Sequence, residues 1–187
     1  MVKCDQGEIQ IEVFTVGHST RSGEEFVKLL KAYDIKLLVD VRSFPGSRRY
    51  PQFNKDELRE LLAPYHIEYR HLPSLGGRRK PRADSKNIAW RNTSFRAYAD
   101  HLESTEFKQG VKELLELASA KRTAIMCSEA VWWRCHRSII ADYLKSIGVV
   151  VKHIVATSKP EIHPYTSAAR IVEGKLSYEG LLSEDQT

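Results

Sequence analysis

The chain reads, over residues 123–137, Thr123-Ala124-Ile125-Met126-Cys127-Ser128-Glu129-Ala130-Val131-Trp132-Trp133-Arg134-Cys135-His136-Arg137. A short apolar run comes first, reactive polar residues follow it, and apolar residues then recur at the helical positions Ile139, Ile140, Tyr143, Leu144 and Ile147. This order is typical of a buried strand, a loop and an amphipathic helix. In alternating α/β chains, ligands bind where such loops leave the carboxyl edge of the sheet. The stretch therefore predicts both an α/β fold and the location of its site.

The same alternation continues along the rest of the chain. Short apolar runs indicate further strands over residues 9–16, 36–42, 67–72 and 149–155. Apolar stripes at helical spacing lie between these runs and extend over residues 95–118. We therefore predict a single α/β domain, with a mainly parallel sheet of about five strands and helices on both faces.

Local signals place two helix starts and one turn. Ser22 with Glu25, and Asn54 with Glu57, have the spacing of capping boxes. The pair Glu173-Gly174 separates two short runs and predicts a small hairpin over residues 170–178.

Length, charge and cysteine content limit the class of protein. The 187 residues suffice for one domain, for which we expect the limits 9–178, with flexible termini at 1–8 and 179–187. No apolar run is long enough for a membrane span and no signal peptide is visible, so we expect a cytoplasmic protein without a membrane partner. Three cysteines fit a reducing compartment. A net charge of +5 is compatible with a phosphate-bearing partner.

Polar side chains follow three of the predicted strands, at the point where each strand ends. These segments are Gly17-His18-Ser19, Asp40-Val41-Arg42 and Cys127-Ser128-Glu129. Because the carboxyl ends of parallel strands share one edge of the sheet, we expect the three segments to converge if their strands are neighbours.

The thiols and the imidazole leave two kinds of chemistry open. Cys135 lies near an expected helix start beside Arg134 and His136, an environment that lowers the pKa of a thiol, so Cys127 and Cys135 are candidate nucleophiles. A phosphatase-type Cys-x5-Arg loop is absent, since Arg134 falls seven places after Cys127. Thiolate and imidazole also suit zinc, but the Cys-x7-Cys-His spacing matches no standard finger or ribbon. The sequence therefore assigns no metal ligand and no cofactor.

Anion binding is the interpretation that the sequence favours most. Arg137 and the N–H groups of a helix that begins near His136 would attract a phosphate or a carboxylate. A second set of candidate ligand-binding residues is Ser19, Arg42, Arg48, Arg49 and Tyr50. Trp132 belongs to a further pattern, in which aromatic and basic residues alternate as they do in single-strand nucleic-acid binders.

These residues together resemble the bacterial and archaeal family catalogued as domain of unknown function 488. The resemblance rests on three pieces, Thr15-Val16-Gly17-His18-Ser19, Asp40-Val41-Arg42-Ser43-Phe44-Pro45 and Cys127-x-Glu129…Cys135-His136-Arg137. It extends roughly from Val13 to Val155. It implies a compact intracellular α/β protein and assigns no activity.

We therefore expect a site at the carboxyl edge that binds, and acts on, a nucleotide, a nucleic acid or another phosphate-bearing molecule. The candidates for catalysis are Cys127, Glu129, Cys135, His136, His18 and Asp40, of which the carboxylates and imidazoles would transfer protons. Two alternatives stay open. One is a nucleic-acid-binding module without catalysis, and the other is an enzyme that depends on a metal or a thiol.

Overall fold

The computed structural model describes residues 10–180 and contains one six-stranded sheet in the order β3-β2-β4-β1-β5-β6. The sheet strands are β1 (Glu12–Gly17), β2 (Leu37–Asp40), β3 (Glu68–His71), β4 (Thr123–Cys127), β5 (Val150–Ile154) and β6 (Glu161–Ile162). The first five are parallel, and β6 pairs antiparallel with β5. The predicted mainly parallel α/β sheet is confirmed, with the two-residue edge strand β6 in addition.

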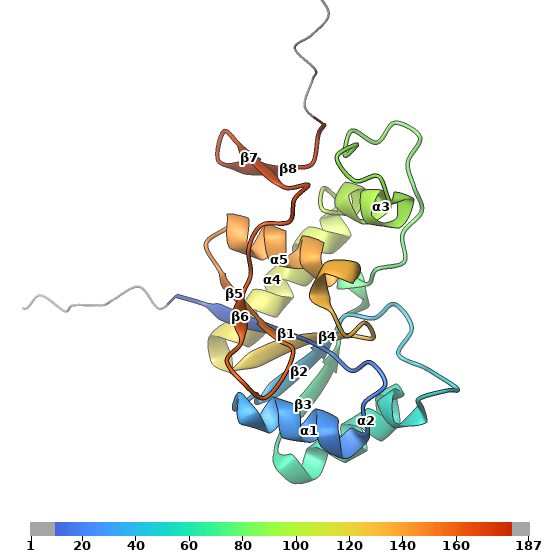
Figure 1. The fold of residues 1–187 in the computed structure, drawn as a ribbon, viewed down its shortest axis with the longest axis vertical. Coiled ribbons are helices and arrows are strands. Elements are labelled where there is room, and N and C mark those ends of the chain that lie inside the picture. Colours follow the sequence, from blue (N-terminus) through green and yellow to red (C-terminus); the bar gives the residue numbers. More distant parts are fainter. Residues whose placement is uncertain (1–9, 181–187) are drawn as a thin grey trace, which may run out of the picture.

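Helices cover both faces of this sheet. They are α1 (Gly23–Ala32), α2 (Lys55–Leu62), α3 (Thr93–His101), α4 (Thr105–Ala120) and α5 (Arg137–Ser146). Figure 1 shows α1 and α2 below the sheet and the other three helices above it. No helix in the described part of the chain is both long enough and apolar enough to cross a lipid bilayer.

The hydrophobic core is split by the sheet into two clusters, as the alternation of side chains along strands requires. On β1, Phe14 and Val16 pack with Phe26 of α1 and Leu58 of α2. On the opposite face, Val13 packs with residues of the remaining helices, including Tyr98, Leu114 and Ile140. The near-continuous apolar composition of the central strands follows from this burial on both faces.

The order of strands creates a topological switch point between β1 and β4. From the carboxyl end of β1 the chain turns into α1, whereas from the end of β4 it turns into α5 on the other face. Adjacent loops that leave a parallel sheet in opposite directions open a crevice at its carboxyl edge. The three polar strand ends therefore surround such a crevice, because β1, β4 and β2 are consecutive neighbours.

Most local expectations hold, and one fails. The capping box of Ser22 and Glu25 is present at α1, and a hairpin of β7 (Arg170–Val172) and β8 (Lys175–Ser177) turns at Glu173-Gly174. The predicted box at Asn54 is wrong, because its side-chain oxygen accepts a hydrogen bond from the backbone of Ser47 instead of capping α2. Ile9, the expected termini 1–8 and residues 181–187 lie outside the described residues.

A chain of buried hydrogen bonds ties α5 to the sheet. His163 donates to Asp142 over 3.0 Å, and its Nδ1 lies 2.9 Å from His153 Nε2. The Nδ1 of His153 lies 2.7 Å from the hydroxyl of Thr15 on β1. Burial first, and then the electrostatic effects of His163 and Arg137, lower the pKa of His153 to about 2, so this imidazole stays neutral at physiological pH.

We predict that the free energy of unfolding falls when the pH is lowered from 7.5 to 5.5. His153 takes up a proton near pH 6.5 only in the unfolded chain, so acid favours unfolding and one such histidine contributes about 1 kcal/mol over this interval. Urea denaturation at both pH values measures the difference. His153→Gln should make the difference in the free energy of unfolding between the two pH values smaller by about 1 kcal/mol. His66→Gln, at an exposed position, should leave that difference unchanged. Unchanged pH dependence in His153→Gln would contradict the prediction.

Candidate functional site

A cavity of about 810 Å³ opens at the carboxyl edge of the sheet, over the ends of β1, β2 and β4. Its volume lies within the range typical of small-molecule sites. The predicted site residues on its wall are His18, Ser19, Arg42, Tyr50, Cys127, Glu129, Cys135 and His136. The tertiary structure thus brings together residues from all three polar strand ends.

Parallel pairing of β1 and β4 sets the position of His18 next to Cys127. Gly17 lies opposite Cys127 in the register, and the pairing continues into the loops, where His18 N–H donates to the Cys127 carbonyl over 3.0 Å. Gly17 permits a close approach, since a Cβ there would lie 1.7 Å from the carbonyl oxygen of Glu129. A residue with a side chain at this position would therefore push the Glu129 loop away from β1.

Arg42 is held in the cavity wall by a buried ion pair with Asp40. The guanidinium donates to Asp40 through Nε and Nη2, at 2.9 and 2.6 Å, and to the carbonyl of Phe53 at 2.7 Å. Tyr69 adds a hydrogen bond to the same carboxylate at 2.7 Å. Asp40 is fully buried and does not line the cavity, so its carboxylate orients Arg42 from behind.

His18 is a neutral acceptor beside that arginine. Its Nδ1 donates to the Ser19 carbonyl at 3.0 Å, which leaves Nε2 to accept from Arg42 Nη1 at 3.3 Å. The ring stacks on Phe53 with 4.2 Å between centroids. Burial first, and the positive charge of Arg42 second, lower the pKa of His18 to about 4, so it carries no charge at neutral pH.

Two thiols converge on one imidazole at the start of α5. The Nδ1 of His136 lies 3.5 Å from the sulfur of Cys135 and 3.9 Å from that of Cys127. Neither cysteine forms a disulfide. Gly77 leaves room for the ring, because a Cβ there would lie 2.5 Å from Nδ1.

The two thiols differ in acidity. Burial opposes ionisation of Cys135, but its hydrogen bond with Cys127 and the charge of Arg137 outweigh burial and lower its pKa to about 6. The same hydrogen bond, together with burial, raises the pKa of Cys127 to about 12. Cys135 is therefore the more acidic of the two thiols.

Arg137 lies behind the wall and not on it. Its side chain is 1% exposed, donates to the Glu129 carbonyl and to Thr15, and has no hydrogen-bond partner for Nε among the described residues. No carboxylate of the described chain pairs with it. Its charge acts on the site through Cys135 and through the loop that carries Glu129.

Other predicted residues also lie away from the cavity. Trp132 stacks on His153 with 4.2 Å between ring centroids, in the 3-10 turn Trp132–Arg134. Arg48 and Arg49 are exposed, and Arg49 lies over the ring of Tyr50. Residues on the wall that the sequence did not assign include Ser43, Phe44, Gly77, Arg78, Ser94, Phe95 and Arg134. Gly76-Gly77, directly before Arg78 in the sequence, was the available signal for that segment.

We predict that Asp40→Asn destabilises the protein by about 3–5 kcal/mol, because it leaves the buried guanidinium of Arg42 without its counter-charge. Tyr69→Phe should cost only about 1 kcal/mol, since it removes one hydrogen bond and leaves the ion pair in place. Urea denaturation at neutral pH measures both variants. Equal stabilities for the two variants would refute this account of the Asp40–Arg42 pair.

The comparisons with known proteins agree with the resemblance of the sequence. The model of the family described as Domain of unknown function DUF488 matches residues 22–144, which include Asp40–Arg42 and Cys127–Arg137. Neither a curated protein nor a solved structure matches the chain. Because the family model covers more than half of the 187 residues, the chain belongs to the DUF488 family.

Proposed function

We propose that the cavity binds a phosphate-bearing ligand of the nucleotide class, either free or as part of a single strand, and holds it against the thiols and His136. The observation that carries this proposal is the charge of the wall, which has three arginines, Arg42, Arg78 and Arg134, and a single carboxylate, that of Glu129. The free thiols favour a reducing compartment, and we place the activity in the cytoplasm.

The three arginines lie at two depths, so they can contact phosphate both inside the cavity and at its rim. Arg42 is buried and oriented by Asp40, with Nη1 toward the His18 side of the cavity. Arg78 and Arg134 are exposed at the rim. Guanidinium groups bind phosphate through paired N–H donors. Hydroxyl groups of the wall add neutral donors and acceptors, on Ser19, Thr20, Ser43, Ser47, Ser94 and Ser128.

Aromatic side chains at the rim support a ligand that carries a base. Phe44 is 69% exposed and the guanidinium of Arg78 lies 5.3 Å from its ring centroid. Trp133, next to Arg134 in sequence, is 52% exposed. Exposed rings beside arginines stack bases while the charges contact phosphates, as in single-strand binders.

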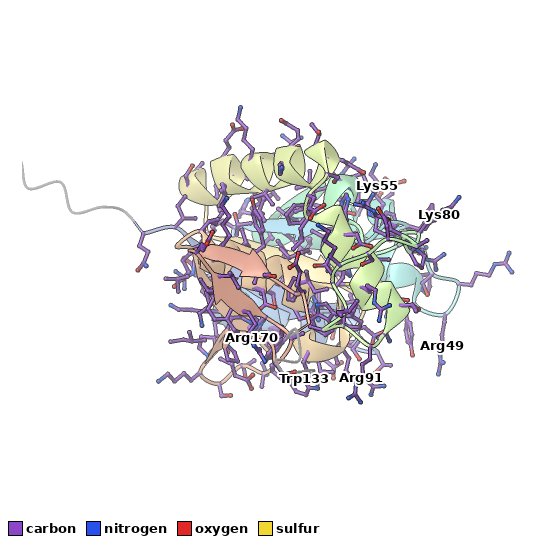
Figure 2. The ribbon with its side chains drawn as sticks, turned by 90° about the horizontal axis from the view of Figure 1, so that it is seen from above. Arg49, Lys55, Lys80, Arg91, Trp133 and Arg170 are labelled. Carbon is purple, nitrogen blue, oxygen red and sulfur yellow. The ribbon has the colours of Figure 1, made fainter. Side chains whose placement is uncertain are left out.

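Further exposed cations outside the cavity wall favour a ligand that extends beyond the cavity. Figure 2 shows Arg49 and Lys80 projecting outward on one side of the view, whereas Arg170 lies on the other side. All three are exposed. A phosphate backbone that leaves the cavity toward Arg49 and Lys80 would gain charge contacts there.

The alternative function, a nucleic-acid-binding module without catalysis that would not use the cavity, is less well supported. Its main basic segment, residues 78–82, is partly neutralised, because Arg79 pairs with Glu106 at 2.8 Å and Arg82 pairs with Asp84 at 3.0 Å. Arg78 and Lys80 are left for phosphate, and Arg78 lines the cavity. The charges of the described chain therefore favour binding at the cavity over binding along the loop.

We predict that Arg78→Ala and Arg134→Ala each weaken binding of a fluorescein-labelled single-stranded oligonucleotide about tenfold, or about 1.4 kcal/mol. Fluorescence anisotropy at constant salt measures the affinity, and a competing nucleoside triphosphate tests whether free nucleotide occupies the same site. Arg170→Ala is the matched control, at an exposed position outside the cavity wall. The proposal fails if all three variants bind equally well or if the wild-type protein does not bind either probe.

A further inference from the structure

We infer that Cys127, Cys135 and His136 form a site for one divalent metal ion of the zinc type, with an open coordination position toward the cavity. This goes beyond ligand binding by the arginines and does not depend on it. The two sulfurs and the imidazole Nδ1 all lie within 4.8 Å of one another. They come from the end of β4 and the start of α5, two segments that the backbone holds in place.

The two sulfur–nitrogen distances in the cluster are close to those of a tetrahedral site. Zinc binds thiolate sulfur at about 2.3 Å and imidazole nitrogen at about 2.0–2.1 Å, so sulfur and nitrogen ligands of one tetrahedral ion lie about 3.6 Å apart. The observed separations from His136 Nδ1 are 3.5 Å to Cys135 and 3.9 Å to Cys127. Both separations are within a few tenths of an ångström of that value.

The imidazole already has the orientation of a metal ligand. His136 Nε2 lies 3.1 Å from the carbonyl oxygen of Val41, which can only accept, so Nε2 carries the proton. The lone pair of Nδ1 is thereby directed at the sulfurs. Ligating histidines typically donate the opposite N–H to a carbonyl or carboxylate, which fixes the tautomer and the ring.

A hydrogen-bonded thiol cluster satisfies these atoms less well than an ion does. Nδ1 has a single lone pair, and two thiols approach it at 3.5 and 3.9 Å. Only one of the two thiols can therefore donate a hydrogen bond to Nδ1, and the sulfur of the other has only a weak contact with the ring. A cation satisfies all three ligand atoms at once, and two thiolates balance the two positive charges of zinc. A bound ion thus adds no net charge beside buried Arg42 and Arg137.

The number of ligands indicates an open site. The described residues supply three ligands to this cluster, and all three line the cavity. Structural zinc sites take four protein ligands, whereas sites with three keep the fourth position for water or substrate. The Cys-x7-Cys-His spacing matches no standard finger or ribbon because the ligands are brought together by the fold. Cys127 ends strand β4, and Cys135 and His136 directly precede helix α5.

The experiment measures metal content by mass spectrometry in gently purified full-length protein, and zinc affinity by competition after removal of metal with a chelator. We expect about one zinc per chain and, with Co²⁺, the near-ultraviolet thiolate-to-cobalt band of a sulfur site. Cys127→Ser, Cys135→Ser and His136→Gln should each weaken zinc binding more than the roughly 10- to 100-fold that is typical when only a hydrogen-bond partner of a metal ligand is lost. His66→Gln, exposed on the surface, should bind zinc like the wild type.

A second measurement does not depend on the folding of variants. In the wild-type protein, zinc should protect Cys127 and Cys135 from alkylation, and a chelator should restore their reactivity. Three results would overturn the site: no zinc bound at micromolar concentration, a cobalt spectrum without the thiolate band, or stoichiometric zinc in Cys135→Ser. A Cys127–Cys135 disulfide in freshly purified protein would also overturn it and indicate a redox pair.

Discussion

Parallel pairing of β1 with β4 is the constraint on which the rest of the site depends. The register sets Gly17 opposite Cys127 and continues into the loops through the hydrogen bonds of His18 and Ser19. Only a glycine at position 17 allows the Glu129 carbonyl and the Arg137 guanidinium to approach this closely. The pairing of β1 with β4 thus brings Gly17-His18-Ser19, the thiol of Cys127 and the guanidinium of Arg137 to the same crevice. The switch in chain direction between these strands keeps that crevice open.

Buried charge is the main energetic cost of this arrangement, and the structure manages it in two ways. Arg42 receives a carboxylate, Asp40, whose oxygens are further bound by Tyr69. Arg137 receives no carboxylate among the described residues, and its positive charge, after the hydrogen bond with Cys127, helps to lower the pKa of the Cys135 thiol. A guanidinium behind the cluster therefore favours sulfur anions at the wall, which is the state that both thiol chemistry and metal binding require.

Several features were predictable because they depend on short-range physics. The strands, the capping box at Ser22 and the Glu173-Gly174 turn follow from side-chain periodicity, capping chemistry and turn preference over a few residues. The same reasoning fails at Asn54, since the backbone N–H of Ser47, in the loop before α2, occupies its side-chain oxygen. The edge strand β6 has two exposed residues and no local pattern, so only its pairing with β5 defines it.

The sequence by itself determined the class of fold, the family and the groups available for chemistry, because these follow from patterns within single elements and short motifs. Only the tertiary structure decided which groups reach the cavity. Asp40 and Arg137 are buried behind the cavity wall, whereas Arg78 and Arg134 line it, although the sequence did not assign either to the site. It also decided that His136 directs Nδ1 at both thiols, through a bond to Val41 that spans 95 residues of sequence. The physical reason is that side-chain direction and charge pairing depend on register and crossovers between distant segments, which local periodicity does not encode.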